Sequence, residues 1–155
     1  MAHEIERKFL VVDSSWKANA PGVLFRQGYL STDKARTVRV RLEGERGVLT
    51  IKGLTRGVTR LEFEYDIPAD DAIRMLDELC ERPLIEKTRY RVAVGRHAWD
   101  VDEFHGDNAG LVVAEVELTS PDDAFERPSW IGREVSDDPR YFNANLVSHP
   151  YRSWS

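Results

Sequence analysis

The stretch His3-Glu4-Ile5-Glu6-Arg7-Lys8-Phe9-Leu10-Val11-Val12 near the N-terminus decides the fold of this 155-residue chain. Read as a β-strand, it places Glu4, Glu6 and Lys8 on one face, because successive side chains of a strand point to opposite sides. Two carboxylates on one face can hold a divalent cation, and a neighbouring lysine can hold the anion that the cation brings. The stretch therefore indicates a metal-dependent phosphate site.

The same alternation of charged and uncharged residues returns in later segments. Arg39 and Arg41 alternate with aliphatic residues, and Lys52 ends the next run of this kind. Further charges follow at period two, at Arg60, Glu62, Glu64, Lys87, Arg89, Arg91, Asp100, Asp102, Glu115 and Glu117. Strand after strand is thus predicted to carry charge on one side.

This charged face has two interpretations. In the first, it is the wet side of an ordinary antiparallel sheet. In the second, the sheet curls so that the charges point inward and line a wet channel for a polyanion and its metals. Solvated faces normally include Ser, Thr, Asn and Gln, whereas this one is nearly all carboxylate, guanidinium or ammonium. The composition favours the channel, an inverted arrangement, since small barrels usually fill their interior with packed side chains.

Periodicity and turn residues predict the secondary structure. Eight strands are expected, at residues 3–11, 24–31, 37–43, 47–53, 59–67, 85–94, 97–104 and 111–119. An amphipathic helix is expected over 68–82, because apolar residues recur there at helical spacing and Pro83 follows. A second helix is expected over 139–148, and a short turn near 121–125. Eight meandering antiparallel strands fit a closed barrel.

Composition and charge exclude several classes of protein. With 41% hydrophobic and 32% charged residues, the chain is expected to fold as one compact domain. Its net charge of −5 argues against a nucleic-acid or anionic-membrane binder. The single cysteine, Cys80, excludes an intramolecular disulfide and is expected to be buried as a small hydrophobe. No apolar run reaches transmembrane length and no signal peptide is evident, so a cytoplasmic location is expected.

The segment Glu4-Ile5-Glu6-Arg7-Lys8 is similar to the ExExK motif of the CYTH superfamily, the triphosphate tunnel metalloenzymes. The resemblance continues in order through seven further segments, at 26–30, 38–42, 50–52, 62–64, 86–90, 100–102 and 115–117. It covers essentially the whole chain and is closest to the short bacterial inorganic tripolyphosphatases. It implies an α+β fold, a closed eight-stranded antiparallel β-barrel (tunnel) with a charged interior and a few flanking helices, in a single domain over residues 1–155.

The resemblance also implies which residues form the site. The phosphate contacts are expected to be Lys8, Arg39, Arg41, Lys52, Arg89 and, more weakly, Arg60. The metal ligands are expected to be Glu4, Glu6, Asp102, Glu115 and Glu117. Mg²⁺ or Mn²⁺ is the expected ion, because carboxylates with water suit hard cations. For any isolated pair of these acids, the alternative is a salt bridge to a neighbouring base.

Lys87, with Tyr29 beside it, is expected from the resemblance to act as the general base. Glu62 and Glu64 are the candidates for holding the attacking water instead of a metal. Crowding by Arg89 and Arg91 would lower the pKa of Lys87 and give an alkaline optimum. The alternative is that Lys87 is another phosphate clamp. Normal turnover with weakened substrate binding in Lys87→Ala would decide for the clamp.

The outside of an inverted barrel must be covered. Aliphatic and aromatic residues between the charged ones would face outward, and a few helices can shield only part of that surface. Leaving the rest wet is costly at roughly 25 cal/mol per Å² of apolar area, so a homodimer is expected. The tryptophans Trp16, Trp99, Trp130 and Trp154 are expected to pack on the outer wall.

The C-terminal helix is expected to cap the tunnel. Short-chain relatives often carry lysines there, whereas this chain reads Arg140-Tyr141-Phe142-Asn143-Ala144-Asn145-Leu146. Arg140 is therefore the one phosphate contact expected from this segment.

The expected function is hydrolysis of a small-molecule triphosphate, foremost inorganic tripolyphosphate, to pyrophosphate and phosphate. A class IV type adenylate cyclase, a thiamine triphosphatase and a non-catalytic polyphosphate-binding module are the alternatives. No purine pocket is evident, which argues against the cyclase. A binding module could dispense with the acids, which are complete in this chain.

Overall fold

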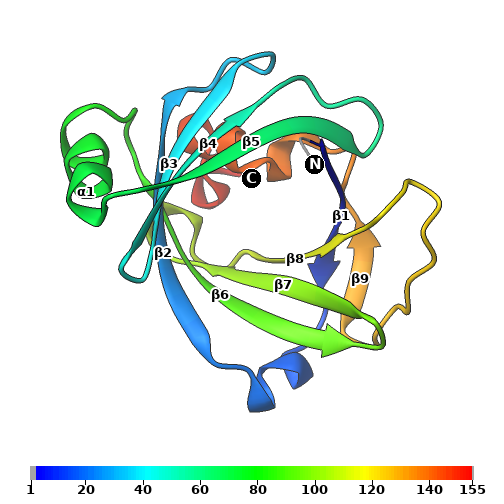
Figure 1. The fold of residues 1–155 in the computed structure, drawn as a ribbon. Helices are drawn as coiled ribbons and strands as arrows, with labels where there is room; N and C mark the ends of the chain where they lie inside the picture. The colour runs from blue at the N-terminus through cyan, green and yellow to red at the C-terminus, as the bar shows by residue number, and fades with distance from the viewer. Residues whose placement is uncertain (1–2, 155) are drawn as a thin grey trace.

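Antiparallel strands form one sheet that closes on itself in the computed structural model, which describes residues 3–154 (Figure 1). The strands are β1 (His3–Val11), β2 (Gly22–Ser31), β3 (Thr37–Glu43), β4 (Arg46–Lys52), β5 (Thr59–Ile67), β6 (Ile85–Val94), β7 (His97–Phe104), β8 (Val112–Glu117) and β9 (Ile131–Glu134). Their order is β5-β4-β3-β2-β6-β7-β8-β1-β9, and β1 also pairs with β5. The predicted closed eight-stranded antiparallel barrel is confirmed, with β9 as an additional strand.

Strand β1 closes the barrel because it pairs with both β5 and β8. Its first residues pair with β5, where Glu4 lies opposite Arg60. Residues 6–10 pair with β8, and Lys8 lies opposite Glu115. Beyond Phe9, β9 pairs with the edge of β1 that β8 leaves free. The segment that carries the two N-terminal acids is thereby fixed on both sides.

Two tight hairpins set the register of the neighbouring strands. Glu43 pairs with Arg46 across the β3–β4 turn, and Val94 pairs with His97 across the β6–β7 turn. Each two-residue turn begins with a glycine, Gly44 or Gly95, whose φ is 63° or 60°. Two-residue hairpins need this left-handed backbone, which glycine adopts without strain. The alternation of inward and outward side chains is thus carried unbroken from strand to strand.

The helices differ in extent from those predicted. Helix α1 (Ala69–Glu78) is shorter than the expected 68–82. The expected helix over 139–148 divides into a 3-10 turn, Pro139–Tyr141, and α2 (Asn143–Ser148). The division occurs at Phe142, whose ψ of 130° is extended. Further 3-10 turns lie at Ser15–Asn19, Gly106–Asn108 and Tyr151–Ser153.

Two of the three hydrophobic clusters lie outside the barrel wall. One packs Phe9, Trp16, Trp99 and Trp130 against the outer faces of β1, β7 and β8. The other packs α1 on β3 and β4 and includes the buried Cys80. Figure 1 shows α1 beside the barrel, away from its opening. The barrel is inverted, because these cores stabilise its wall from outside while its inner face stays polar.

The third cluster plugs one end of the barrel. Tyr29, Ile85, Phe104 and Val113 continue the inward-facing rows of their strands, and they pack with Leu146 and other residues of the C-terminal segment. The inward rows therefore change from charged to apolar toward this end. The C-terminal segment, orange to red in Figure 1, covers it.

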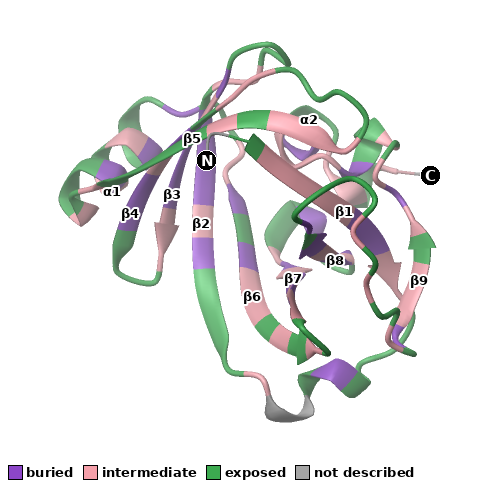
Figure 2. Ribbon diagram, turned by 45° about the vertical axis from the view of Figure 1, so that its right-hand side comes forward, coloured by how far each residue is buried: buried purple, intermediate pink, exposed green. Residues whose placement is uncertain are grey.

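Part of the outer wall remains uncovered. Ile51, Leu61, Phe63 and Tyr65 on β4 and β5 are 39–56% exposed. Ile51 and Phe63 are directly paired across the two strands, so these side chains form one apolar patch. Figure 2 shows mostly exposed and intermediate residues along β5. No helix within residues 3–154 is long and apolar enough to cross a membrane.

Candidate active site

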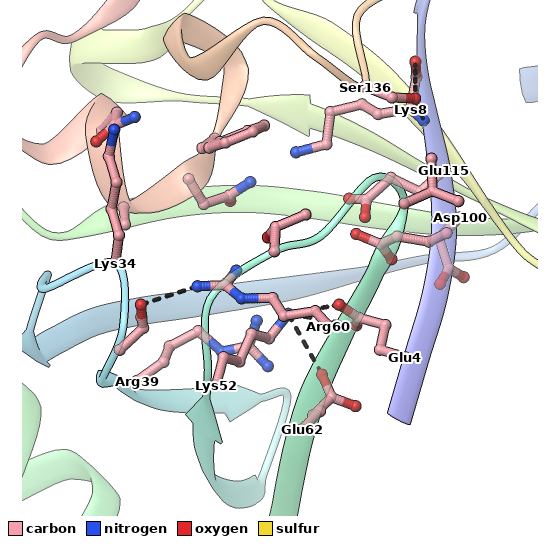
Figure 3. Close-up of a pocket in the computed structure, with 18 of the residues that line it drawn as sticks. Glu4, Lys8, Lys34, Arg39, Lys52, Arg60, Glu62, Asp100, Glu115 and Ser136 are labelled. Atoms are coloured by element: carbon pink, nitrogen blue, oxygen red, sulfur yellow. Dashed lines mark hydrogen bonds and ion pairs between the residues drawn. The ribbon is translucent and has the colours of Figure 1, made fainter. Parts of the chain in front are cut away.

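A cavity of about 390 Å³ lies inside the barrel (Figure 3). Its lining contains fourteen of the fifteen site residues predicted on the strands: Glu4, Glu6, Lys8, Tyr29, Arg39, Arg41, Lys52, Arg60, Glu62, Glu64, Lys87, Arg89, Glu115 and Glu117. Asp102 does not line it. The lining also includes residues that were not predicted to belong to the site: Thr32, Lys34, Thr37, Thr55, Gly57, Val58, Asp100, Ser136 and residues 142–145.

The charges in the cavity are segregated by sign. Carboxylates come from four adjacent strands in the order β7, β8, β1 and β5, which supply Asp100, Glu115, Glu117, Glu4, Glu6, Glu62 and Glu64. Lysines and arginines come from β4, β3 and β6 on the other side, which supply Lys52, Arg39, Arg41, Lys87 and Arg89. Lys8 and Arg60 are bases on the acidic strands. The cavity thus has an acidic wall facing a basic wall.

The bases of the basic wall are held by partners within the barrel. Lys52 lies 3.2 Å from Glu4 and 3.3 Å from Glu62, so it links the two walls (Figure 3). Arg39 donates to Thr50 Oγ1 at 3.0 Å and lies 3.8 Å from Glu64. Arg41 pairs with Glu43, and Lys87 and Arg89 both pair with Asp102. These contacts fix the cationic groups before any ligand arrives, which is the preorganisation that anion binding needs.

The carboxylates of the acidic wall interact in pairs. Burial, reinforced by Glu115 and Glu4, raises the pKa of Glu6 well above its usual value. Burial and a hydrogen bond with Glu4 raise the pKa of Glu62 to about 7. Burial opposes ionisation of Glu115 too, yet Lys8, a hydrogen bond from Glu6 and Arg89 hold its pKa well below the usual value. Each pair thus favours one bound proton over two negative charges, because two close carboxylates disfavour each other's ionisation.

A divalent cation fits this donor set. A cation would replace the shared proton between carboxylates, and Mg²⁺ and Mn²⁺ prefer oxygen ligands. Glu6 also lies directly opposite Glu117 in the sheet, a like-charge pair that is unfavourable without a counter-ion. Among residues 3–154, no three His, Cys, Asp or Glu side chains are close enough to form a preassembled metal site. Water and phosphate oxygens would therefore complete the coordination.

Lys87 is the most perturbed base in the cavity. It is 1% exposed, and its Nζ lies 2.8 Å from Asp102 Oδ2 and 3.0 Å from Asn143 Oδ1. Burial lowers its pKa to about 7, aided by Arg89 and Arg41 and opposed by Asp102. Arg91, which was expected to act together with Arg89, has a 74% exposed side chain that pairs with Asp100 at 3.5 Å, and Arg41 takes its place. Lys87 can therefore be neutral near physiological pH.

A hydrogen-bond chain ties Lys87 to Tyr29 and to the C-terminal helix. Asn143, the first residue of α2, accepts from both Lys87 and Gln27, the latter at 3.1 Å. Gln27 also donates to the Tyr29 hydroxyl at 3.2 Å. Tyr29 is 3% exposed and lines the cavity. Tyr29 was expected beside Lys87, whereas Asn143 belongs to no charged row and was not predicted to be part of the site.

Asp102 lies behind the basic wall. Its oxygens accept from Arg89 at 2.7 and 2.8 Å and from Lys87, and it is fully buried. Burial disfavours its ionised form, but Arg89 and Lys87 outweigh burial and lower its pKa to about 2. Asp100, two residues earlier on β7, lines the cavity instead and lies opposite Glu115. The expectation that Asp102 faces the cavity as a metal ligand is corrected, because its oxygens serve Arg89 and Lys87.

The C-terminal segment contributes to the site without Arg140. The guanidinium of Arg140 is bound by Asp138 and stacks over Tyr141 and Trp154, outside the cavity lining. The expectation that it contacts phosphate is corrected on this geometry. The backbone oxygen of Tyr141 instead accepts from Lys8 Nζ at 3.1 Å. The segment therefore acts through its backbone and through Phe142 and Asn143, which line the cavity.

Sequence similarity to known proteins extends over nearly the whole chain. The family model described as "CYTH domain" matches residues 2–151. A protein of Acetivibrio thermocellus named inorganic triphosphatase is 51% identical over 154 residues, covering 99% of each chain. One of Nitrosomonas europaea with the same name is 37% identical over 149 residues, covering 93% of this chain and 96% of its own.

A solved structure shares the fold. The crystal structure of the inorganic triphosphatase NE1496 superposes with a TM-score of 0.67 at 33% identity, covering 95% of both chains. The family match spans nearly the whole chain, and both relatives exceed 30% identity along almost their full length. The chain belongs to the CYTH domain family.

Proposed function

We propose that this protein is a divalent-metal-dependent hydrolase that cleaves inorganic triphosphate to pyrophosphate and phosphate. The observation that carries the proposal is the opposition of an acidic and a basic wall across one cavity. A polyphosphate needs cationic groups along its chain, and its metals need carboxylates on the other side. The name shared by the two relatives supports the same substrate.

The basic residues of the cavity bind the phosphate chain. Arg39, Arg41 and Arg89 present planar guanidinium groups, which suit two-point contacts with phosphate oxygens. Lys8 and Lys52 act as point charges, and Arg60 adds a weaker contact because it already donates to Gly53 O and Thr37. Fixed charges of this kind neutralise the substrate and lower the repulsion of an incoming nucleophile.

The acidic wall holds the metal. Glu4, Glu6, Glu115 and Glu117 are the proposed ligands, joined by Asp100 in place of Asp102. Mg²⁺ or Mn²⁺ bound there would supply Lewis acidity to the phosphate oxygens and neutralise their charge. Glu62 and Glu64 lie on the same wall and orient the attacking water through hydrogen bonds.

Lys87 accepts the proton from water. The Nζ of a neutral lysine carries two N–H groups and one lone pair. Asp102 and Asn143 accept the two N–H groups, so the lone pair is free to accept a proton. With a pKa of about 7, the neutral form is available from neutral pH upward, which supports the alkaline optimum. Tyr29, joined to Asn143 through Gln27, helps to hold this arrangement.

A phosphate-release panel tests the proposal. Inorganic triphosphate, ATP and thiamine triphosphate are each incubated with Mg²⁺, with Mn²⁺ or with neither, and the products are identified. We expect phosphate and pyrophosphate from inorganic triphosphate only when a metal is present. Cyclic AMP with pyrophosphate from ATP would identify a cyclase instead, and tight binding without turnover would identify a binding module.

We also propose a homodimer and a cytoplasmic location. The apolar patch of Ile51, Leu61, Phe63 and Tyr65 supports the dimer, since burying it against a second copy would remove it from water. The single cysteine is buried and needs no oxidising compartment. Small-angle scattering that shows a monomer at high concentration would contradict the dimer.

A further inference from the structure

Lys34 differs from the other bases of the cavity. It lies between β2 and β3, outside every strand, and it lines the cavity although it is exposed. The buried bases Lys8, Arg39, Arg41 and Lys87 are at most 8% exposed, so they form the inner part of the site. Among the described lining residues of the exposed class, Lys34 is the one base. It therefore marks the outer part of the cavity.

Lys34 also has no partner among residues 3–154. Its ammonium makes no ion pair within 4.0 Å and no side-chain hydrogen bond, whereas Lys52, Arg39, Arg41, Lys87 and Arg89 are all paired with carboxylates. The nitrogen–oxygen distances are 3.2 Å for Lys52, 3.8 Å for Arg39 and 2.8 Å for Lys87. In Figure 3 Lys34 lies at the left of the view, whereas Glu115 and Asp100 lie at the right. Its charge is free for a ligand.

The rest of the outer lining is poorly suited to a nucleoside. Thr55 and Gly57, in the loop between β4 and β5, are exposed lining residues that offer only small groups. The aromatic residues of the described lining are Tyr29, which is 3% exposed, and Phe142, whose ring centroid lies 5.8 Å from the ammonium of the inner base Lys8. A base-stacking surface is absent from the described lining at this end, and Lys34 is the main attractive group for an incoming anion.

We propose that Lys34 is a specificity-determining substrate contact that binds the outer terminal phosphate of inorganic triphosphate. This inference rests on the proposed function. Inorganic triphosphate has a terminal phosphate at both ends, each with two ionisable oxygens. A nucleoside triphosphate that enters with its γ-phosphate inward presents an esterified α-phosphate at the outer position, with one ionisable oxygen. A lysine at that position favours the inorganic compound by charge and by hydrogen bonding.

The test compares Lys34→Gln with Arg36→Gln. Arg36 lies on the same loop, is exposed, pairs with Asp33 at 2.9 Å and does not line the cavity. Both substitutions remove one positive charge from the loop, so they change the long-range field alike and differ in contact with the cavity. Steady-state constants are measured for inorganic triphosphate, together with the inhibition constant of ATP as a competitor.

We expect Lys34→Gln to raise KM for inorganic triphosphate roughly fivefold with kcat within about twofold, the size of one partly exposed charge contact. The inhibition constant of ATP should rise less, Arg36→Gln should match the wild type, and Lys34→Arg should restore KM. Equal effects of Lys34→Gln and Arg36→Gln, or equal weakening of inorganic triphosphate and ATP, would overturn the inference.

A binding measurement separates this inference from the proposed function. Calorimetric titration of inorganic triphosphate into the metal-free wild type and both variants reports the contact without turnover. Weaker binding by Lys34→Gln alone supports the contact even if the wild type hydrolyses nothing, an outcome that would refute the proposed function. Identical affinities of all three proteins would overturn the inference while leaving hydrolysis by the wild type intact.

Discussion

Lys87 is a buried amine held by two acceptors. Asp102 and Asn143 each accept one of its N–H groups, and the neutral amine has only two. Its lone pair is then directed to the remaining position, and Lys87 lines the cavity. Burial lowers the pKa to about 7, with Arg89 and Arg41 acting in the same direction. The position of Lys87 in the cavity lining and its lowered pKa both suit a general base.

Lys87→Ala tests this role through the pH dependence of kcat/KM. Because the pKa is lowered, the ammonium loses its proton as the pH rises through about 7, and the wild-type rate should rise across that range. We expect the variant to lose the rising limb and about 10²–10⁴-fold in kcat, with KM changed little. A normal kcat with a raised KM would show that Lys87 is a phosphate clamp.

Asp102→Asn and Asp100→Asn test whether Asp102 has a structural role and Asp100 a role in metal binding. Asp102 is fully buried against Lys87 and Arg89, so its neutralisation should cost about 3 kcal/mol and lower the melting temperature. Asp100 is partly exposed in the cavity, and its variant should keep its melting temperature but require more metal for activity. Thermal unfolding and metal titration of activity measure both effects. If Asp102→Asn kept its melting temperature but needed more metal for activity, Asp102 would be a metal ligand after all.

At the scale of elements, α2 couples the C-terminal segment to the catalytic strands. Phe142 breaks the helical path, and the chain re-enters a helix at Asn143, whose side chain reaches Lys87 and Gln27. The backbone just before the break accepts from Lys8. A short helix of six residues thus contacts β6 and β2, and the chain preceding it contacts β1.

Asn143→Asp tests this coupling with a nearly isosteric change. A carboxylate 3.0 Å from the Lys87 ammonium stabilises the charged form, so the pKa of Lys87 should rise by roughly one unit. The rising limb of kcat/KM should move to higher pH by the same amount. Asn145→Asp adds the same charge to the same helix and the same cavity lining, and it serves as the control because the Asn145 amide donates to Pro139 O and has no hydrogen bond with Lys87. An unshifted limb in Asn143→Asp would show that α2 does not act on the base.

The strands that carry charged residues at every second position were predictable from the sequence. The elements that depend on contacts between residues far apart in the chain were not. Period two and glycine turns locate β1 to β8 within a few residues. Strand β9 has four residues and exists because the free edge of β1 accepts it. Asp100 and Asp102 share a face, so their sequence spacing cannot tell which lies at the depth of Arg89. Lys34 and Asn143 lie outside the charged rows, and only the fold brings them to the cavity.

At the scale of the molecule, the residues that stabilise the barrel and the residues of the proposed site lie largely on opposite faces of the barrel wall. The buried aromatic and aliphatic clusters lie outside or at one end, where they hold the barrel closed. Inside, carboxylates from four adjacent strands lie side by side on one wall, and their burial and mutual repulsion raise the pKa of Glu6 and Glu62. This interior is unfavourable for folding and becomes favourable when a cation enters, which is a common trade between stability and activity.

Glu6→Gln tests this trade across the whole protein. Burial, Glu115 and Glu4 raise the pKa of Glu6 well above its usual value, so an uncharged amide resembles the protonated form that the metal-free fold prefers. We expect the metal-free variant to melt a few degrees above the wild type. Mg²⁺ should raise the melting temperature of the wild type through linkage, and should raise that of the variant much less. Calorimetry with and without Mg²⁺ measures both shifts, with equal NaCl as the control for ionic strength. If Mg²⁺ stabilised the two proteins equally, Glu6 would not be a ligand, and the acidic wall would owe its charges to ion pairing with the bases alone.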